Sequence, residues 1–167
     1  MKYERGGALL ETALFTPFLI LLLVGMTELG RITYTHYTLQ KMMYTLARFL
    51  GTQQGVNFCS ADDATIAAAK NYALTGSLET GAPPILTNLT ADMIQVRIER
   101  YNPQTAELAE CECAASLIGC DTGGGARAPD FIVVSLPDGY SVTPAIPYLN
   151  SQVIALRPVV RVPYGGT

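Results

Sequence analysis

Charged residues are scarce in this chain, which limits the partners it can bind. Only 15% of the residues are charged, 49% are hydrophobic, and the formal net charge is −3. A weakly acidic chain is not attracted to nucleic acid, so no polynucleotide partner is expected. The chain is also too apolar for disorder, and it holds no linker long enough to separate two outer domains.

Motifs for catalysis and for cofactor binding are also lacking. The single histidine, His36, has no serine or cysteine beside it on an elbow-like turn, so a hydrolase arrangement is hard to build. The run Gly123-Gly124-Gly125 lacks the lysine of a phosphate-binding loop. The cysteines lack the paired spacing of zinc knuckles. We therefore predict no enzymatic activity, no cofactor and no metal site.

The chain does have a long apolar segment near its N-terminus, and Thr12–Thr27 holds no charged residue. Ala8–Gly30 counts 23 residues, and as a helix it would reach roughly 34 Å, enough to cross a hydrocarbon core of about 30 Å. Lys2 and Arg5 precede it, which predicts a cytoplasmic N-terminus and an external remainder. No A-x-A-like site follows Val24, which disfavours an ordinary secretory signal; a plain uncleaved anchor stays open.

The helical pattern continues beyond the apolar segment. Apolar residues recur at alternating spacings of three and four, which predicts one helix over residues 7–50 that spans the membrane at about 8–30. This first stripe consists of Leu29, Ile32, His36, Leu39, Met43, Leu46 and Leu50. A second stripe, Tyr34, Tyr37, Lys41 and Tyr44, is predicted to pack on the outer domain or on a neighbour. The outer half of the helix is amphipathic and needs a partner surface.

Residues 51–167 are predicted to form one extracytoplasmic α+β domain. Ser60 is the expected N-cap of a short helix that includes 65–74 and ends at Gly76. Strand-like runs follow at 93–101, 108–113, 131–136, 140–146 and 153–162, and Pro137-Asp138-Gly139 predicts a hairpin between the third and fourth runs. We expect a mainly antiparallel sheet of about four strands beside the short helix.

Four cysteines, Cys59, Cys111, Cys113 and Cys120, all follow the apolar segment. On the external side of a membrane an oxidising compartment favours disulfides. Cys111 and Cys113 are poorly placed to bond each other, because residues two apart in a strand point to the same face. One of the two is therefore expected to pair with Cys59 and the other with Cys120, and the sequence leaves open which.

Glu11 is a lone carboxylate just inside the apolar segment. Burying an unpaired charge there costs at least a few kcal/mol, so Glu11 is expected to have a cationic partner. If the chain were cut between Gly6 and Gly7, the new amino terminus would lie four residues before Glu11. The α-amino group on a neighbouring helix could then pair with the carboxylate.

These N-terminal residues carry a resemblance to a known family. A short basic leader, glycine, a glutamate at the fifth mature position and a later proline form the class III signal of type IV pilin-like proteins. The segment Arg5-Gly6-Gly7-Ala8-Leu9-Leu10-Glu11, followed by Pro17 and Leu19–Leu23, is most similar to the TadE-like branch, the minor pseudopilins of tight-adherence (Flp) pili. Residues 25–31 also resemble that branch, and 140–147 and 156–163 resemble its closing strands more weakly.

The resemblance implies a function and a set of partners. Residues 1–6 would be a leader that a prepilin peptidase removes at Gly6, with Gly7 as the competing position and the spacing to Glu11 favouring Gly6. Glu11 and Pro17 would serve assembly. Other pilins and pseudopilins, an inner-membrane pilus platform and the lipid bilayer would be the partners, in pilus biogenesis and surface adhesion.

Two other readings stay open beside assembly. The chain could be an uncleaved, membrane-anchored periplasmic scaffold of a secretion or pilus apparatus. An anchored enzyme is the third reading, and it would need a catalytic site that the sequence does not display.

Overall fold

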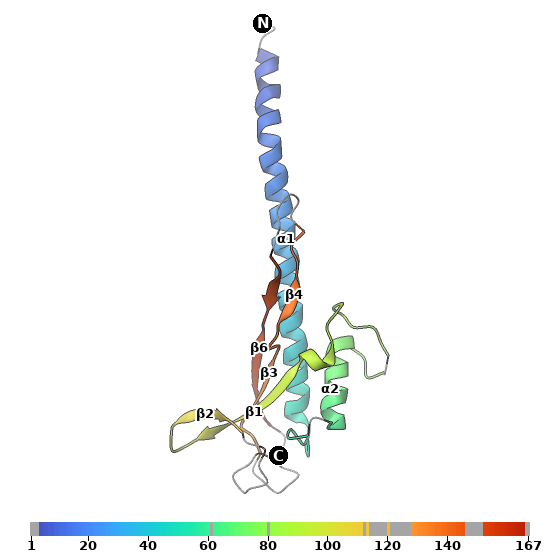
Figure 1. The fold of residues 1–167 in the computed structure, drawn as a ribbon, viewed down its shortest axis with the longest axis vertical. Helices are drawn as coiled ribbons and strands as arrows, with labels where there is room; N and C mark the ends of the chain where they lie inside the picture. The colour runs from blue at the N-terminus through green and yellow to red at the C-terminus, as the bar shows by residue number, and fades with distance from the viewer. Residues whose placement is uncertain are drawn as a thin grey trace.

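The computed structural model describes residues 4–60, 62–79, 81–111, 113, 120, 128–145 and 152–165. A single long helix, α1 (Glu4–Thr52), carries a small α+β domain along its second half (Figure 1). The domain consists of α2 (Ala64–Thr75), the short 3-10 helix η1 (Ala91–Met93), and the strands β1 (Gln95–Asn102), β2 (Glu107–Glu110), β3 (Phe131–Ser135), β4 (Tyr140–Val142), β5 (Ile154–Leu156) and β6 (Val159–Pro163). The predicted α+β fold is confirmed.

Helix α1 is uninterrupted over 49 residues, which corresponds to about 73 Å of helix. It extends beyond the predicted 7–50 at both ends. It also continues through Pro17, which has no N–H to donate to the preceding turn. A proline is tolerated in an apolar helix where neighbouring groups can satisfy the freed carbonyl.

The outer half of α1 forms one wall of the hydrophobic core. Leu39, Met43, Leu46 and Leu50, all from the first predicted stripe, are at most 2% exposed. They pack with buried residues of α2, β1 and β3, and a ring contact between Phe49 and Tyr72 joins α1 to α2. The partner surface that the stripe requires is thus the domain of the same chain.

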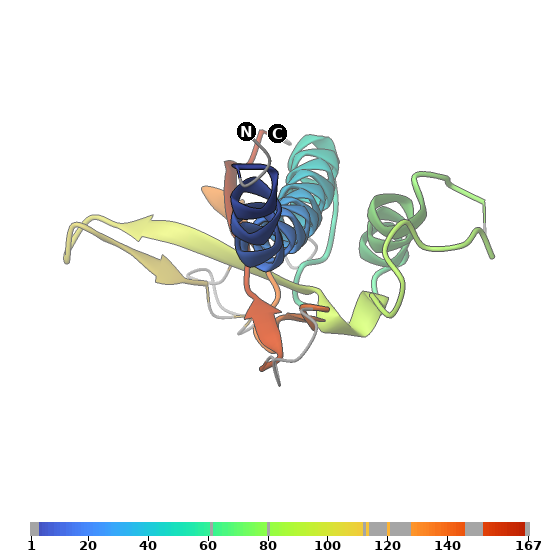
Figure 2. The ribbon, with the colours of Figure 1, turned by 90° about the horizontal axis from the view of Figure 1, so that it is seen from above.

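The main sheet has the strand order β2-β1-β3-β6, and all its pairings are antiparallel. Strand β3 is central and almost entirely buried. Alternate residues such as Ile98 and Ile132 face the core, as expected for a sheet with one covered face. Seen along α1, helix α2 lies on one side and the β1–β2 hairpin extends on the other (Figure 2).

The predicted cap of α2 is wrong. Asp63, not Ser60, is the N-cap, because its carboxylate accepts hydrogen bonds from the backbone N–H groups of Thr65 and Ile66. Those donors have no partner within the first turn of a helix. The C-terminal prediction is confirmed, since Gly76 ends α2 in the left-handed conformation with φ of 73°.

The predicted hairpin across Pro137-Asp138-Gly139 is also wrong. A turn does form there, with the N–H of Gly139 bonded to the carbonyl of Leu136, but β3 already has β1 and β6 as its two neighbours. Strand β4 instead pairs with β5 in a separate two-stranded sheet. The run predicted as one strand over 153–162 is divided at Pro158, because β5 and β6 belong to different sheets. Residue 146 of the predicted fourth run lies outside the described residues.

Candidate assembly surface on the long helix

The first half of α1 exposes apolar side chains on all of its faces. From Leu9 to Leu29 the leucine, isoleucine, phenylalanine and methionine side chains are 55–74% exposed, and Val24 is partly buried. The helix is long and apolar enough to cross a membrane, by length and composition, and its most apolar window is not buried by the rest of the chain. A helix that is apolar all round has to be covered by lipid or by other helices. The structure therefore leaves this segment as a surface that needs a cover.

Threonine hydroxyls in this helix are satisfied internally. Thr16 donates to the carbonyl of Thr12 at 2.6 Å, and Thr27 donates to that of Val24 at 2.8 Å. Such bonds to the preceding turn leave a polar side chain without need of water. Threonine is therefore no obstacle to placing this segment in lipid or against another helix.

Glu11 is the exception on this surface. Its side chain is exposed, and none of the ion pairs among the described residues includes it. Gly7 and Pro17 are exposed on the same helix, and a Cβ at Gly7 would meet nothing within 4 Å. Gly6 lies in the same first turns of α1. Residues 1–3 of the predicted leader lie outside the described residues.

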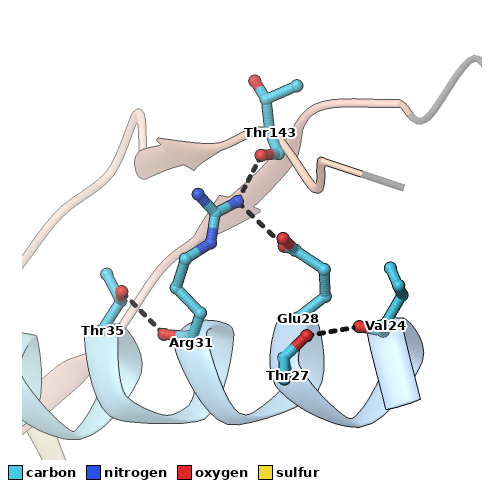
Figure 3. Close-up of polar contacts among 6 residues, drawn as sticks. All are labelled: Val24, Thr27, Glu28, Arg31, Thr35 and Thr143. Carbon is cyan, nitrogen blue, oxygen red and sulfur yellow. Dashed lines mark hydrogen bonds and ion pairs between the residues drawn. The ribbon is translucent and has the colours of Figure 1, made fainter. Parts of the chain in front are cut away.

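An ion pair that we did not predict lies where the apolar segment ends (Figure 3). Glu28 and Arg31, one turn apart, are joined by a contact of 3.0 Å between Oε2 and Nη2. The same Nη2 of Arg31 donates to the carbonyl oxygen of Thr143, just beyond β4, at 2.6 Å. The Glu28 side chain is only 15% exposed. This contact ties the β4 end of the domain to α1 at the predicted membrane boundary.

Glu28 closes an apolar run in the sequence, where a glutamate is more often an interfacial end residue than a functional group. The usable signal was the spacing, since an acid and a base three residues apart face each other on a helix. The third member, the Thr143 carbonyl, is 112 positions away from Arg31 and has no local signal.

The four cysteines lie near the far end of α1. The structure joins Cys59 to Cys113 and Cys111 to Cys120 in disulfides. This is one of the two pairings that the sequence left open. The first bridge links the segment between α1 and α2 to the residues after β2, and the second closes a much shorter loop. All four sulfurs are therefore engaged in bonds.

The second stripe of α1 remains uncovered. Tyr34, Tyr37 and Tyr44 are 70%, 64% and 50% exposed, and Lys41 is exposed with them. Of the two predicted surfaces for this stripe, the domain of the same chain is not the one that covers it. A neighbouring molecule is the remaining prediction.

Comparison with known families and proteins gives one match. Residues 6–48, which lie entirely within α1, match the model of the TadE-like protein family. No curated protein and no solved structure matches the chain. The matched segment contains Glu11, Pro17 and the Glu28–Arg31 pair. That family is structural rather than catalytic. The long apolar helix and the family together indicate a membrane-anchored protein.

The match includes the N-terminal residues 6–31 on which the resemblance rests, and it does not include the C-terminal runs 140–147 and 156–163. Its segment is also the one that exposes the apolar surface and the unpaired carboxylate. Helix α1 thus carries the segment that matches the TadE-like protein family, which is associated with the tight-adherence pilus system.

Proposed function

We propose that this chain is a minor pseudopilin that assembles, through the first half of α1, with other pilins of a tight-adherence (Flp) pilus. The observation that carries the proposal is the helix that is apolar on every face and holds one exposed carboxylate, Glu11. Lipid covers such a surface in the membrane, and other helices of the same kind replace lipid in a filament. Pilus biogenesis and surface adhesion follow as its roles.

The proposed topology follows from charge and from the cysteines. Lys2 and Arg5 flank the span on the side that becomes cytoplasmic, so the outer domain lies in the periplasm of a bacterium, anchored in its inner membrane. The two disulfides are stable in that oxidising compartment. The domain would reach the cell exterior only as part of a pilus.

Processing by a prepilin peptidase would create the partner that Glu11 lacks. Cleavage after Gly6 leaves the α-amino group of Gly7 four residues before the carboxylate. In a neighbouring subunit that amine can pair with Glu11, which offsets the cost of holding the charge in an apolar surround. An inner-membrane pilus platform would then extract the helix from the bilayer.

Replacing Glu11 tests this proposal. We expect Glu11→Ala and Glu11→Gln to reduce surface pili at least about tenfold, because each leaves the partner amine unpaired among apolar helices. Both variants should stay in the membrane fraction, since the span becomes more apolar. Pili are counted by electron microscopy, and association is measured by co-purification with the other pilins.

The matched control is Glu79→Ala, which removes an exposed carboxylate from the outer domain. It should leave pili unchanged. Normal piliation and co-purification in the Glu11→Ala strain would overturn the assembling role.

One observation favours a second candidate, an uncleaved periplasmic scaffold of a secretion or pilus apparatus. Gly6 and Gly7 both lie within α1, whereas peptidases cut exposed, irregular backbone most readily. A scaffold would keep its leader, and a pseudopilin would lose it. The two functions therefore differ in the N-terminus of the protein found in cells.

A further inference from the structure

The two-stranded sheet of β4 and β5 lies along α1 and ends near the apolar half of that helix (Figure 1). Its height is set by Arg31, whose guanidinium contacts the carboxylate of Glu28 one turn earlier and the carbonyl oxygen of Thr143 just after β4. The end of β4 is therefore level with the turn Glu28–Arg31. That turn holds the first charged residues after the uncharged Thr12–Thr27, so it marks the outer boundary of the apolar span.

The headgroup layer of a bilayer reaches the height of this sheet. A bilayer has a hydrocarbon core of about 30 Å and a total thickness of about 40–45 Å, so each headgroup layer is roughly 5–7 Å deep. With the hydrocarbon boundary at Glu28–Arg31, that layer includes Tyr34, which is about 4.5 Å beyond Arg31 along the helix. Tyr34 is 70% exposed, and an amphipathic ring is favoured at this depth. The end of the β4–β5 sheet therefore lies within the same layer.

Apolar side chains at this end of the sheet are left uncovered by the domain. Ile154 lies on the same face of the sheet as Tyr140 and Leu156, which pack against the hydrophobic core. It is nevertheless 40% exposed, and Val153 beside it is 59% exposed. The hydrophobic core thus stops short of the end of the sheet, and two β-branched side chains there face the surroundings of the domain.

The sequence of this sheet suits a layer that disfavours unpaired charge. Gly139–Leu156 counts 18 residues and holds no charged one. It is the longest uncharged stretch of the chain, longer than Thr12–Thr27 in the span. The two longest uncharged stretches of this sequence therefore meet at the turn that carries Arg31.

Carboxylates of the main sheet lie at the other end of the domain. Glu99 pairs with Phe131, and Phe131 pairs with Pro163. The carbonyl oxygen of Pro163 is 3.3 Å from the position that a Cβ on Gly51 would take. Gly51 is about 30 Å from Arg31 by the helical rise. Strand β2, which holds two more carboxylates, pairs with β1 at that same end. The acidic strands thus lie far from the bilayer, and the uncharged sheet lies next to it.

We propose that the end of the β4–β5 sheet, with Val153 and Ile154, inserts into the headgroup layer of the bilayer that α1 spans. It would be a second membrane contact, continuous with the apolar helix because Arg31 joins the two where the span ends. Moving β-branched side chains out of water into this layer is favourable. Since Gly139–Leu156 holds no basic residue, the contact needs no anionic lipid. It rests on the membrane span in the proposed function and uses neither Glu11 nor assembly.

A second contact beside the span would restrict the outer domain. A single helix lets its domain turn and tilt over the bilayer, whereas two contacts on the same surface hold its height and its rotation. Moving α1 out of the bilayer along its axis would also withdraw Val153 and Ile154 from the headgroup layer. The sheet would therefore add resistance to extraction of the helix.

Single tryptophans test this depth, because the chain contains no tryptophan of its own. Full-length Val153→Trp is reconstituted at low protein density in phosphatidylcholine vesicles, with and without lipid that carries a nitroxide on its headgroup. Insertion into the headgroup layer should quench the tryptophan fluorescence at least about twofold, because the two groups then share a layer roughly 5–7 Å deep.

The matched control is Val159→Trp, because Val159 on β6 is 61% exposed against 59% for Val153. Val159 pairs with Ser135, which is four residues along β3 from the level of Gly51. That leaves roughly 17 Å of the 30 Å between Gly51 and Arg31, so this tryptophan lies beyond the headgroup layer. Its quenching should stay below about 10%.

A third position separates an inserted sheet from a misfolded one. Ser141 is exposed and pairs with Ala155, two residues from Val153. Ser141→Trp should therefore be quenched less than Val153→Trp and more than Val159→Trp. Equal quenching at the three positions, no quenching at Val153, or quenching there only after anionic lipid is added would overturn the contact.

A probe in the span separates this contact from the proposed function. Leu19→Trp, near the middle of Ala8–Gly30, should be quenched by a nitroxide near the end of the acyl chain. Quenching at Leu19 with none at Val153 would overturn only the contact. No quenching at Leu19 would overturn the span, and with it both the contact and the proposed function. Normal pili in Glu11→Ala cells would contradict assembly and leave the predicted quenching unchanged.

Discussion

Asp63 joins two neighbouring segments at the start of α2 through the hydrogen bonds of its carboxylate. Its carboxylate accepts from the backbone N–H of Asn57, Thr65 and Ile66, which joins the end of the α1–α2 connection to the first turn of α2. Burial raises its pKa, but these N–H donors outweigh burial and hold the pKa of Asp63 below the ordinary value of 3.8. The charged form is thus favoured by folding.

We predict that Asp63→Ala lowers the free energy of unfolding by about 1 kcal/mol, the usual cost of losing an N-cap. Asp63→Asn keeps a capping oxygen and should lose less. Urea unfolding of the full chain in detergent, followed by circular dichroism, measures both values. An alanine variant as stable as the parent would contradict the capping role.

The same residue predicts a pH dependence. A carboxyl group with a depressed folded-state pKa stabilises the fold above its unfolded pKa, and that stability is lost as the pH falls through the folded-state value. The difference in unfolding free energy between the parent and Asp63→Asn should therefore be constant near neutral pH and shrink below about pH 4. A difference that persists unchanged at pH 2 would contradict the assignment.

At the scale of elements, the small β4–β5 sheet depends on α1. Gly139 sets its start: its φ of 78° suits glycine, and a Cβ there would come within 3.0 Å of the Cβ of Ala155. Its far end is tied by Arg31, which bonds the Thr143 carbonyl while paired with Glu28. The two contacts hold a short sheet that has few hydrogen bonds of its own.

We predict that Arg31→Ala loosens this sheet without unfolding the domain. Arg31 is half exposed, so its contacts are worth about 0.5–1 kcal/mol, and hydrogen exchange of the β4 amides should quicken about two- to fivefold. Hydrogen–deuterium exchange with mass spectrometry measures this directly. Arg48→Ala, which removes another exposed arginine of α1, is the control, and an equal effect from it would contradict a specific role for Arg31.

The elements show which parts of the fold follow from local sequence. The run of α1 and the burial of Leu39 to Leu50 were predicted, because a 3.6-residue period and an apolar run are properties of one segment. The partner of β4 was not predicted correctly, because strand pairing depends on which sheet edges other strands already occupy. Pro158 was a usable signal that the last run is two strands, since proline interrupts a sheet ladder.

The site divides in the same way. Glu11, Pro17 and the glycines lie within a few turns of one helix, so the sequence alone gives their spacing. Their role in assembly remains a prediction. The bond from Arg31 to Thr143 joins residues that only the tertiary fold brings together. Strand geometry reduced the possible disulfide pairings to two. Choosing between these two required the three-dimensional positions of the residues after β2, which the sequence does not give.

At the scale of the whole molecule, the two halves of α1 have different surroundings. The second half is buried by the domain on one side, and the first half is apolar and uncovered on every side. In the proposed function, this division lets one helix serve both as a wall of the outer domain's core and as the part that enters lipid or a filament. The domain can therefore stay folded while the cover of the span changes from lipid to protein.

The mass of the N-terminus in cells tests the central claim most directly. The chain would be purified from the membrane fraction and from sheared pili of cells with an active prepilin peptidase, with peptidase-deficient cells as the control. A pseudopilin should begin at Gly7 in both fractions and at Met1 in the control. A chain that begins at Met1 in the membranes of normal cells, and is absent from sheared pili, would contradict assembly and favour the scaffold.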